Sequence, residues 1–185
     1  PGDGGIFVLP TVLVTPPPHP LDGLSRRELE CRVALVPAEL GTASLGAPNR
    51  GALFNGVAFE SNHLWQLESP ENAWATPETI AALRRAVEQV HRLHPNTSRL
   101  HLGDASRPAG GTLRPHRSHQ AGRDVDVGFF YTTGPAWYAI ATADNLDRPR
   151  TWTFLRALLA EGEVESVFLD HRVQSLLLEH ATQRG

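Results

Sequence analysis

The strongest regular pattern of apolar and polar residues lies in the segment ATPETIAALRRAVEQVHRLHP, residues 75–95. One apolar stripe at helical spacing consists of Ile80, Leu83, Val87 and Val90. Thr76 is a favourable N-cap, and Pro77 suits the first helical position because its missing amide is not needed there. Pro95 and Asn96 are typical of the end of a helix. The pattern therefore predicts an amphipathic helix between these signals.

Further elements follow on the C-terminal side of this helix. Alternating or continuous apolar runs predict strands within residues 98–106, 124–131 and 164–170. Helical spacing predicts two more helices, over residues 150–161 and 172–183. This order of elements predicts an α+β fold with a mainly antiparallel sheet flanked by helices.

The first 45 residues differ in character from the rest of the chain. An apolar run predicts a short strand within residues 6–14, but the consecutive prolines 16–18 follow it. Proline lacks an amide donor and favours extended polyproline geometry, which is typical of a linker. Residues 24–36 are expected to form a short helix that runs into a strand. We therefore divide the chain into an N-terminal arm, residues 1–45, and one domain, residues 46–185.

Length, composition and charge narrow the class of protein. A chain of 185 residues with 41% hydrophobic residues suits one soluble globular domain with a real core. The net charge of −3 and the scattered basic residues argue against a nucleic-acid-binding surface, which needs a concentrated positive field. No apolar run approaches the length of a membrane-spanning helix.

The first residue and the cysteine content add two expectations. The chain begins at Pro1 and contains no methionine, which indicates a processed or excised fragment from which any signal peptide has gone. Its one cysteine, Cys31, has no second cysteine in the chain for a disulfide. The simpler interpretation of Cys31 is a buried small apolar residue, and the alternative is a disulfide partner outside the given residues.

Candidate chemistry is concentrated in the segment RPHRSHQAGRDVDVGFF, residues 114–130. The candidate ligands are His116, His119, Asp124 and Asp126, and imidazole and carboxylate groups are usual zinc ligands. Gly122 allows a tight turn that folds His119 back over Asp126, and residues two apart on a strand share one face. Two carboxylates on one face repel each other unless a divalent cation, an arginine or a histidine lies beside them.

A polar loop that enters an ordinary strand is the alternative interpretation of this segment. Histidines are common in loops, and a pair such as Arg123 with Asp124 needs no metal. Four candidate ligands exceed what a plain turn requires, so we favour a metal site. Either His116, His119 and Asp126 hold the ion together, or a further ligand comes from elsewhere. The spacing does not match the helical metalloprotease motif, and the chain has no phosphate loop, nucleophile elbow or cysteine pair.

The segment HRSHQAGRDVDVGF, together with LHLGDASRPAGG upstream, resembles the penicillin-insensitive murein endopeptidase family. That family belongs to the wider group of zinc peptidases that includes the D-Ala-D-Ala metallopeptidases. The similarity extends from about Gly51 to the C-terminus and includes the segments 75–95, 150–161 and 164–170. It implies a zinc peptidase fold of the D-Ala-D-Ala metallopeptidase type and leaves residues 1–45 without a counterpart.

The resemblance implies a zinc-dependent murein endopeptidase in which His119 and Asp126 bind zinc. His116 would be a further ligand or would lie beside the metal. The zinc ion would polarise the scissile carbonyl and activate a water, as a metal with an open position can. The implied substrate is a D-amino-acid peptide cross-link in bacterial peptidoglycan, which implies a periplasmic or secreted protein. The substrate-binding residues expected around the site are Ser118, Gln120, Arg123 and Arg107, while Asp104, like Arg107, is expected to be structural first.

The sequence departs from this family in one respect. Family members carry a His-x-His pair on a later strand, where one histidine completes the zinc site and the other lies beside the reacting water. No His-x-His occurs here, so the catalytic histidine is expected beyond residue 185. A cysteine often follows that pair in the family and would be a disulfide partner for Cys31. Two alternatives remain: a catalytically incomplete module that binds peptidoglycan, and a related zinc carboxypeptidase or dipeptidase.

Overall fold

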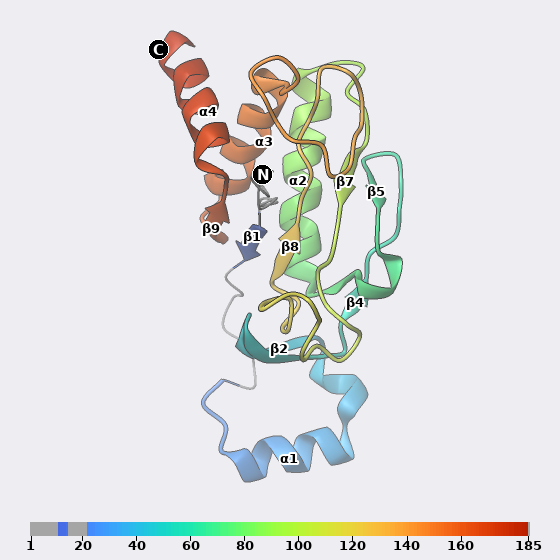
Figure 1. The fold of residues 1–185 in the computed structure, drawn as a ribbon. Helices are drawn as coiled ribbons and strands as arrows, with labels where there is room; N and C mark the ends of the chain where they lie inside the picture. Colours follow the sequence, from blue (N-terminus) through green and yellow to red (C-terminus); the bar gives the residue numbers. More distant parts are fainter. Residues whose placement is uncertain (1–10, 15–21, 185) are drawn as a thin grey trace, which may run out of the picture.

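The computed structural model describes residues 11–14 and 22–184. The expectations for the prolines 16–18 and for the first half of the strand predicted within residues 6–14 lie outside these residues. Helices pack beside small, mainly antiparallel sheets (Figure 1), which confirms the predicted α+β class. No helix in the described part of the chain combines the length and the apolar character that crossing a membrane requires.

The sheet that carries the candidate site has three strands in the order β8 (Asp124–Asp126), β1 (Thr11–Val14) and β9 (Val164–Phe168). Both pairings of β1 are antiparallel, and Val12 lies opposite Val125 on one side and Val167 on the other. Because Val12 is fully buried, apolar burial as well as hydrogen bonding holds β1 in place. A strand from the N-terminal region thus lies at the centre of this sheet, while the division of the chain at residue 45 stays a prediction.

The helices cover this sheet and supply much of the core. Helix α2 (Pro77–Leu93) packs against β1 and against α3 (Arg148–Ala160), and α4 (His171–Arg184) packs on α3. The Thr76 hydroxyl accepts a hydrogen bond from the Thr79 amide at 3.3 Å, so the predicted N-cap is confirmed. The predicted apolar stripe is also confirmed, because its members Leu83, Val87 and Val90 are fully buried and Ile80 is half-buried.

Short strands connect the site region to the core. β5 (Trp65–Leu67) pairs with β7 (Leu100–Leu102) in parallel, whereas the other pairs of described strands are antiparallel. The 3-10 helix η2 (Pro70–Asn72) follows β5. The antiparallel pairs are β2 (Ala43–Ala47) with β3 (Arg50–Phe54), and β4 (Val57–Ala58) with β6 (Trp74–Ala75). A bridge between Leu102 and Val127 places β7 beside the end of β8. The strand predicted over residues 124–131 therefore ends early, at Asp126.

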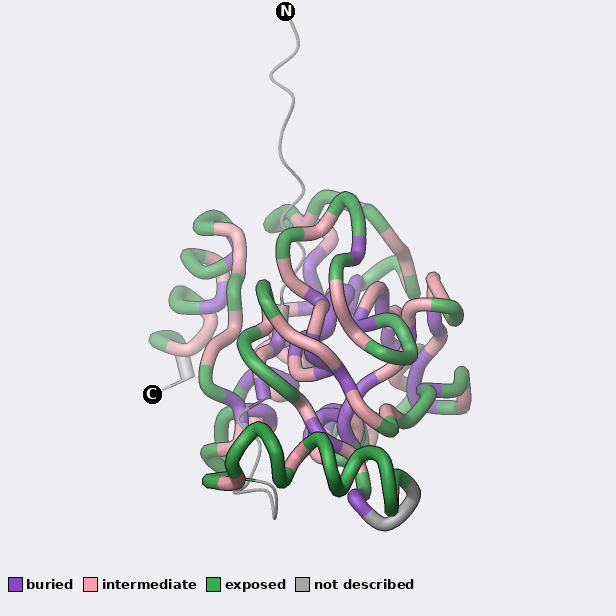
Figure 2. The backbone as a smooth tube through the Cα atoms, turned by 90° about the horizontal axis from the view of Figure 1, so that it is seen from below, coloured by how far each residue is buried: buried purple, intermediate pink, exposed green. Residues whose placement is uncertain are grey.

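Helix α1 (Arg26–Leu35) lies apart from the core (Figure 1) and contains no buried residue, as the colours of Figure 2 also show. Ser25 and Glu28 form a reciprocal capping box at its start. The prediction of a strand after this helix is wrong, because Pro37 begins a 3-10 helix, η1 (Pro37–Leu40). The interpretation of Cys31 as a buried apolar residue is also wrong, because the side chain is exposed on α1.

Candidate metal centre

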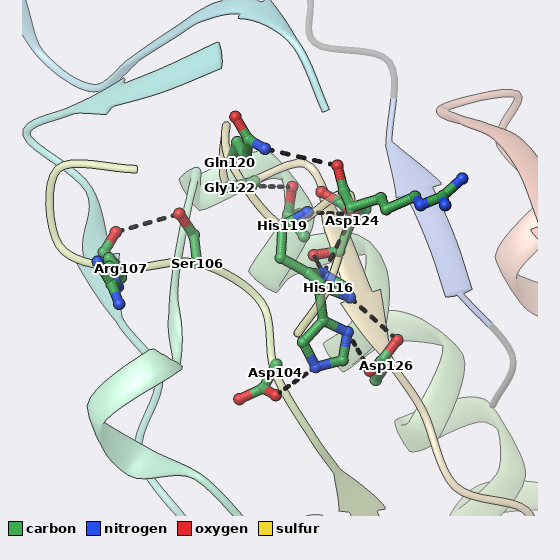
Figure 3. A network of polar contacts seen from close by, with 11 residues as sticks. Asp104, Ser106, Arg107, His116, His119, Gln120, Gly122, Asp124 and Asp126 are labelled. Atoms are coloured by element: carbon green, nitrogen blue, oxygen red, sulfur yellow. Dashed lines mark hydrogen bonds and ion pairs between the residues drawn. The ribbon is translucent and has the colours of Figure 1, made fainter. Parts of the chain in front are cut away.

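The candidate ligands come from strand β8 and from the loop that precedes it (Figure 3). Asp124 and Asp126 are two residues apart on β8, and both carboxylates lie beside the His119 imidazole. Gly122 turns the chain between loop and strand with a φ of +67°, and a Cβ there would lie 2.9 Å from the Leu53 side chain. A glycine is therefore required where the loop folds back, as the sequence predicts.

His119 is held from both sides by the two aspartates of β8. Its Nδ1 atom lies 3.1 Å from Asp124 Oδ2, and its Nε2 atom lies 3.2 Å from Asp126 Oδ1. The backbone has a positive φ of 62°, and its N–H donates to Asp124 Oδ2 at 2.9 Å. Asp124 therefore fixes both the backbone and the ring of a histidine that is only 1% exposed.

His116 forms a second, more open pair on the other side of Asp126. Its Nε2 atom lies 2.9 Å from Asp104 Oδ2, and its Nδ1 atom lies 3.8 Å from Asp126 Oδ2. Asn72 Nδ2 donates to the other oxygen of Asp104 at 2.9 Å. The rings of His116 and His119 are 4.7 Å apart and nearly perpendicular. Asp126 thus lies between two histidines, each of which also contacts a second aspartate.

The buried carboxylates control the charge of His119. Burial of the imidazole acts to lower its pKa, but the hydrogen bonds to Asp124 and Asp126 and the negative charges of both outweigh burial. Together they raise the pKa of His119 from 6.5 to about 10. In the absence of a metal, the imidazole is therefore a cation that compensates two carboxylates. A bound cation would take over that compensation and displace the proton.

The residues fit a divalent transition-metal ion. His116, His119 and Asp126 each present one ligand atom, and these atoms lie within 4.8 Å of one another. Two imidazole nitrogens and one carboxylate oxygen are a donor set used in catalytic zinc sites, where water takes the remaining position. Asp124 contacts Nδ1 of His119, so the other ring nitrogen, Nε2, faces Asp126. Carboxylates outside a metal site commonly orient the metal-binding histidines in this way.

The structure brings together the three residues predicted as metal ligands, but it does not gather the four predicted substrate-binding residues around them. Arg107 is exposed and lies apart from His116 and Asp126 in Figure 3, and the half-buried Gln120 points away from them. Arg123 donates to the backbone carbonyl of Gly46. Ser118 is half-buried in the loop between the two histidines. Both the ligand roles and the substrate-binding roles stay predictions.

Sequence reasoning missed two members of this network. Asp104 contacts His116 directly, although it was expected to be structural first, and Asn72 orients Asp104. Asp124 pairs with His119, so the alternative pairing with Arg123 is wrong. One signal for Asp104 was available, because it lies near the end of the segment 98–106, where a strand is predicted that could lie beside the strand of Asp126. Nothing in the sequence around Asn72 indicates its role.

Two comparisons with known proteins place this centre in context. No curated protein matches the chain. A family model described as penicillin-insensitive murein endopeptidase matches residues 44–184, which include both histidine–aspartate pairs. This range covers well over half of the sequence and confirms the resemblance that the motifs HRSHQAGRDVDVGF and LHLGDASRPAGG indicate. The chain therefore belongs to the penicillin-insensitive murein endopeptidase family.

Proposed function

We propose that the protein is a zinc-dependent endopeptidase that hydrolyses D-amino-acid peptide cross-links in bacterial peptidoglycan, in the periplasm or outside the cell. The observation that carries the proposal is the meeting of His116, His119 and Asp126 within the range that matches the family. Their ligand atoms form a compact group of two imidazoles and one carboxylate, which suits an ion that keeps an open coordination position.

The buried ligands would hold the ion, and the more exposed ligand would lie on the side that substrate can reach. His119 and Asp126 are buried and fixed by their contacts, so they would hold the ion in one geometry. A zinc ion bound there would polarise the scissile carbonyl and lower the pKa of a bound water. His116 is the more exposed member, and it would bind the ion or hold a proton at Nδ1 beside it.

The outer aspartates would keep the two imidazoles in the tautomers that the site needs. Asp124 accepts at Nδ1 of His119, and Asp104 accepts at Nε2 of His116, so the opposite nitrogen of each ring faces Asp126. Ser118, Gln120, Arg123 and Arg107 would bind substrate only if the loop that carries them turns toward the centre in the complex. We propose these roles as secondary to the metal centre.

The decisive change is Asp126→Ala, because Asp126 is the group that both histidines face. We expect the full-length wild-type protein to bind zinc and to split the peptide cross-links of murein sacculi, which releases soluble fragments without cross-links, and chelation to abolish this release. Asp126→Ala should lose zinc binding and activity together. Metal content by mass spectrometry and product analysis by chromatography measure the two effects.

The matched control is Asp144→Ala, which removes an exposed carboxylate outside the cluster and should change neither property. Retention of zinc and activity by Asp126→Ala would refute the proposal. Saturable binding of sacculi without soluble products would favour a binding module instead. Release of single terminal amino acids from defined peptides would indicate a carboxypeptidase.

A further inference from the structure

Two glycines leave a flat area on the sheet face that carries Asp126. Gly103 donates its N–H to Asp126 O at 2.8 Å, and Gly128 donates to His101 O at the same distance. Leu102 and Val127 are fully buried on the opposite face of these segments. Since side chains alternate along extended chains, His101, Gly103, Asp126 and Gly128 share the outer face.

Trp137 covers this flat area. A Cβ built on Gly103 would lie 2.7 Å from Trp137 Cη2 and Cζ2, and one on Gly128 would lie 3.5 Å from Cζ3. The indole also stacks on the His101 ring, with centroids 6.2 Å apart and an interplanar angle of 20°. His101 is in turn paired with Glu68. The Trp137 indole therefore packs directly on the backbone of Gly103 and Gly128, and a side chain on Gly103 would clash with it.

The site where Trp137 packs adjoins the candidate metal centre directly. The same Cβ on Gly103 would lie 3.1 Å from Asp126 Cβ, so one glycine separates the indole from the shared ligand. The indole edge and the Asp126 Cβ atom both approach Gly103 on one face of the sheet. A group bound at the metal therefore has an apolar aromatic surface beside it.

Tyr138 extends the aromatic surface outward. Its ring lies 5.0 Å from the Trp137 ring at 62°, and the residue is 63% exposed. Tyr138 also has a positive φ of 58°, which is unfavourable for a bulky residue with a Cβ. Residues held in unfavourable backbone conformations are concentrated at functional sites.

We propose that Trp137 and Tyr138 form an aromatic wall that selects the substrate residue supplying the scissile carbonyl, and that it contacts the methyl group of a D-alanine there. The inference rests on the proposed function. A carbonyl held at the metal would have its own Cα and side chain within a few bonds, and only Gly103 lies between the indole and Asp126. The indole face is apolar and half-exposed, so it suits a small alkyl group.

A sugar ring is the other part of peptidoglycan that could stack on these aromatic rings. The wall adjoins Asp126 itself, however, and the glycan is joined to the peptide away from the cross-link. The position of the wall therefore favours the peptide. The experiment below includes the sugar as an outcome.

The test compares two soluble cross-linked peptides that differ only in D-alanine or glycine at the residue that supplies the scissile carbonyl. The zinc-loaded full chain should cleave the D-alanine peptide with the higher kcat/KM. Trp137→Ala should lower that value about tenfold, since one methyl group in an apolar site is worth roughly this factor. The glycine peptide should be affected much less, so the preference should fall toward one, with zinc content unchanged.

Two further variants separate a role in selectivity from a role in folding. Trp152→Ala is the matched control, because Trp152 is a half-buried tryptophan facing the groove between α2 and α3. It should leave the preference unchanged. Tyr138→Gly removes the ring and relieves the positive φ, so the melting temperature should hold or rise while the preference falls.

Three results would contradict the proposed role of Trp137 and Tyr138. They are an unchanged preference in Trp137→Ala, equal losses on both peptides, and a loss confined to substrates that carry sugar. If the wild type cleaves neither peptide, the proposed function has failed, and calorimetric binding of the same peptides to the zinc-loaded chain then decides. Weaker binding of the D-alanine peptide to Trp137→Ala supports the wall, and equal binding of that peptide to both proteins refutes it.

Discussion

The two histidine–aspartate pairs that flank Asp126 have the same components but different surroundings. The side chains of His119 and Asp124 are each 2% exposed, whereas those of His116 and Asp104 are 28% and 18% exposed. The same contact is electrostatically stronger where water is excluded, and it is also harder to rearrange. The buried pair is therefore suited to fixing an ion, and the open pair is suited to adjusting to water or substrate.

Replacement of each histidine by alanine tests this comparison most strongly. His119→Ala leaves two buried carboxylates without their cation, and breaking such a group costs about 3–5 kcal/mol of unfolding free energy. His116→Ala breaks a partly exposed pair, for which about 1 kcal/mol or less is expected. Urea unfolding of the metal-free variants measures both values. Equal destabilisation would show that the two pairs are not distinct.

Replacement of each outer aspartate gives the next largest effect. Asp124→Asn should weaken zinc binding by about 10–100-fold, because outer carboxylates that orient metal-binding histidines contribute on this scale. Asp104→Asn should weaken zinc binding by about tenfold or less, at the lower end of that range. The reason is that the pair of His116 and Asp104 is more open to water. Competition with a chromogenic chelator measures both constants. A larger loss for Asp104→Asn would reverse the assignment of fixed and adjustable sides.

The pH dependence of the metal-free protein tests the same comparison through the charge of His119. The folded-state pKa of His119 is about 10, above the usual 6.5, so the folded state holds its proton more tightly than the unfolded state. The resulting stabilisation is complete below about pH 6.5 and is lost as pH rises toward 10. Thermal unfolding between pH 6 and 10 should show this loss in the wild type. Asp124→Asn should lose less stability over this pH range. If stability fell equally with pH in both proteins, the raised pKa of His119 would not be the cause.

The parts of the centre that were predictable are those close together in sequence. His119 and Asp126 are seven residues apart across a glycine turn, so local geometry alone suggested their meeting. The predicted helix at residues 77–93 likewise followed from a cap, a proline and an apolar stripe. These signals act within one or two turns of chain and do not depend on the rest of the fold.

The parts that were not predictable depend on contacts between distant segments. Asp104 reaches His116 only because the chain after β7 runs beside β8, where Asp126 N donates to Asp104 O at 2.9 Å. Asn72 joins through a further segment, after β5. The strand predicted over residues 124–131 ended early because Val127 forms only a bridge before the chain leaves the sheet. Apolar pattern alone does not reveal which neighbours a strand has.

The position of β1 has a practical consequence for anyone who trims this protein. The range that matches the family begins at residue 44, and β1 lies before it, hydrogen-bonded to both β8 and β9. A polypeptide cut to residues 44–184 would leave both strands with open edges, which are sites of intermolecular pairing. Such a fragment is expected to aggregate, and the strand that carries Asp126 would lose the neighbour that aligns it. Domain boundaries drawn from sequence similarity would then remove a strand that the metal centre needs.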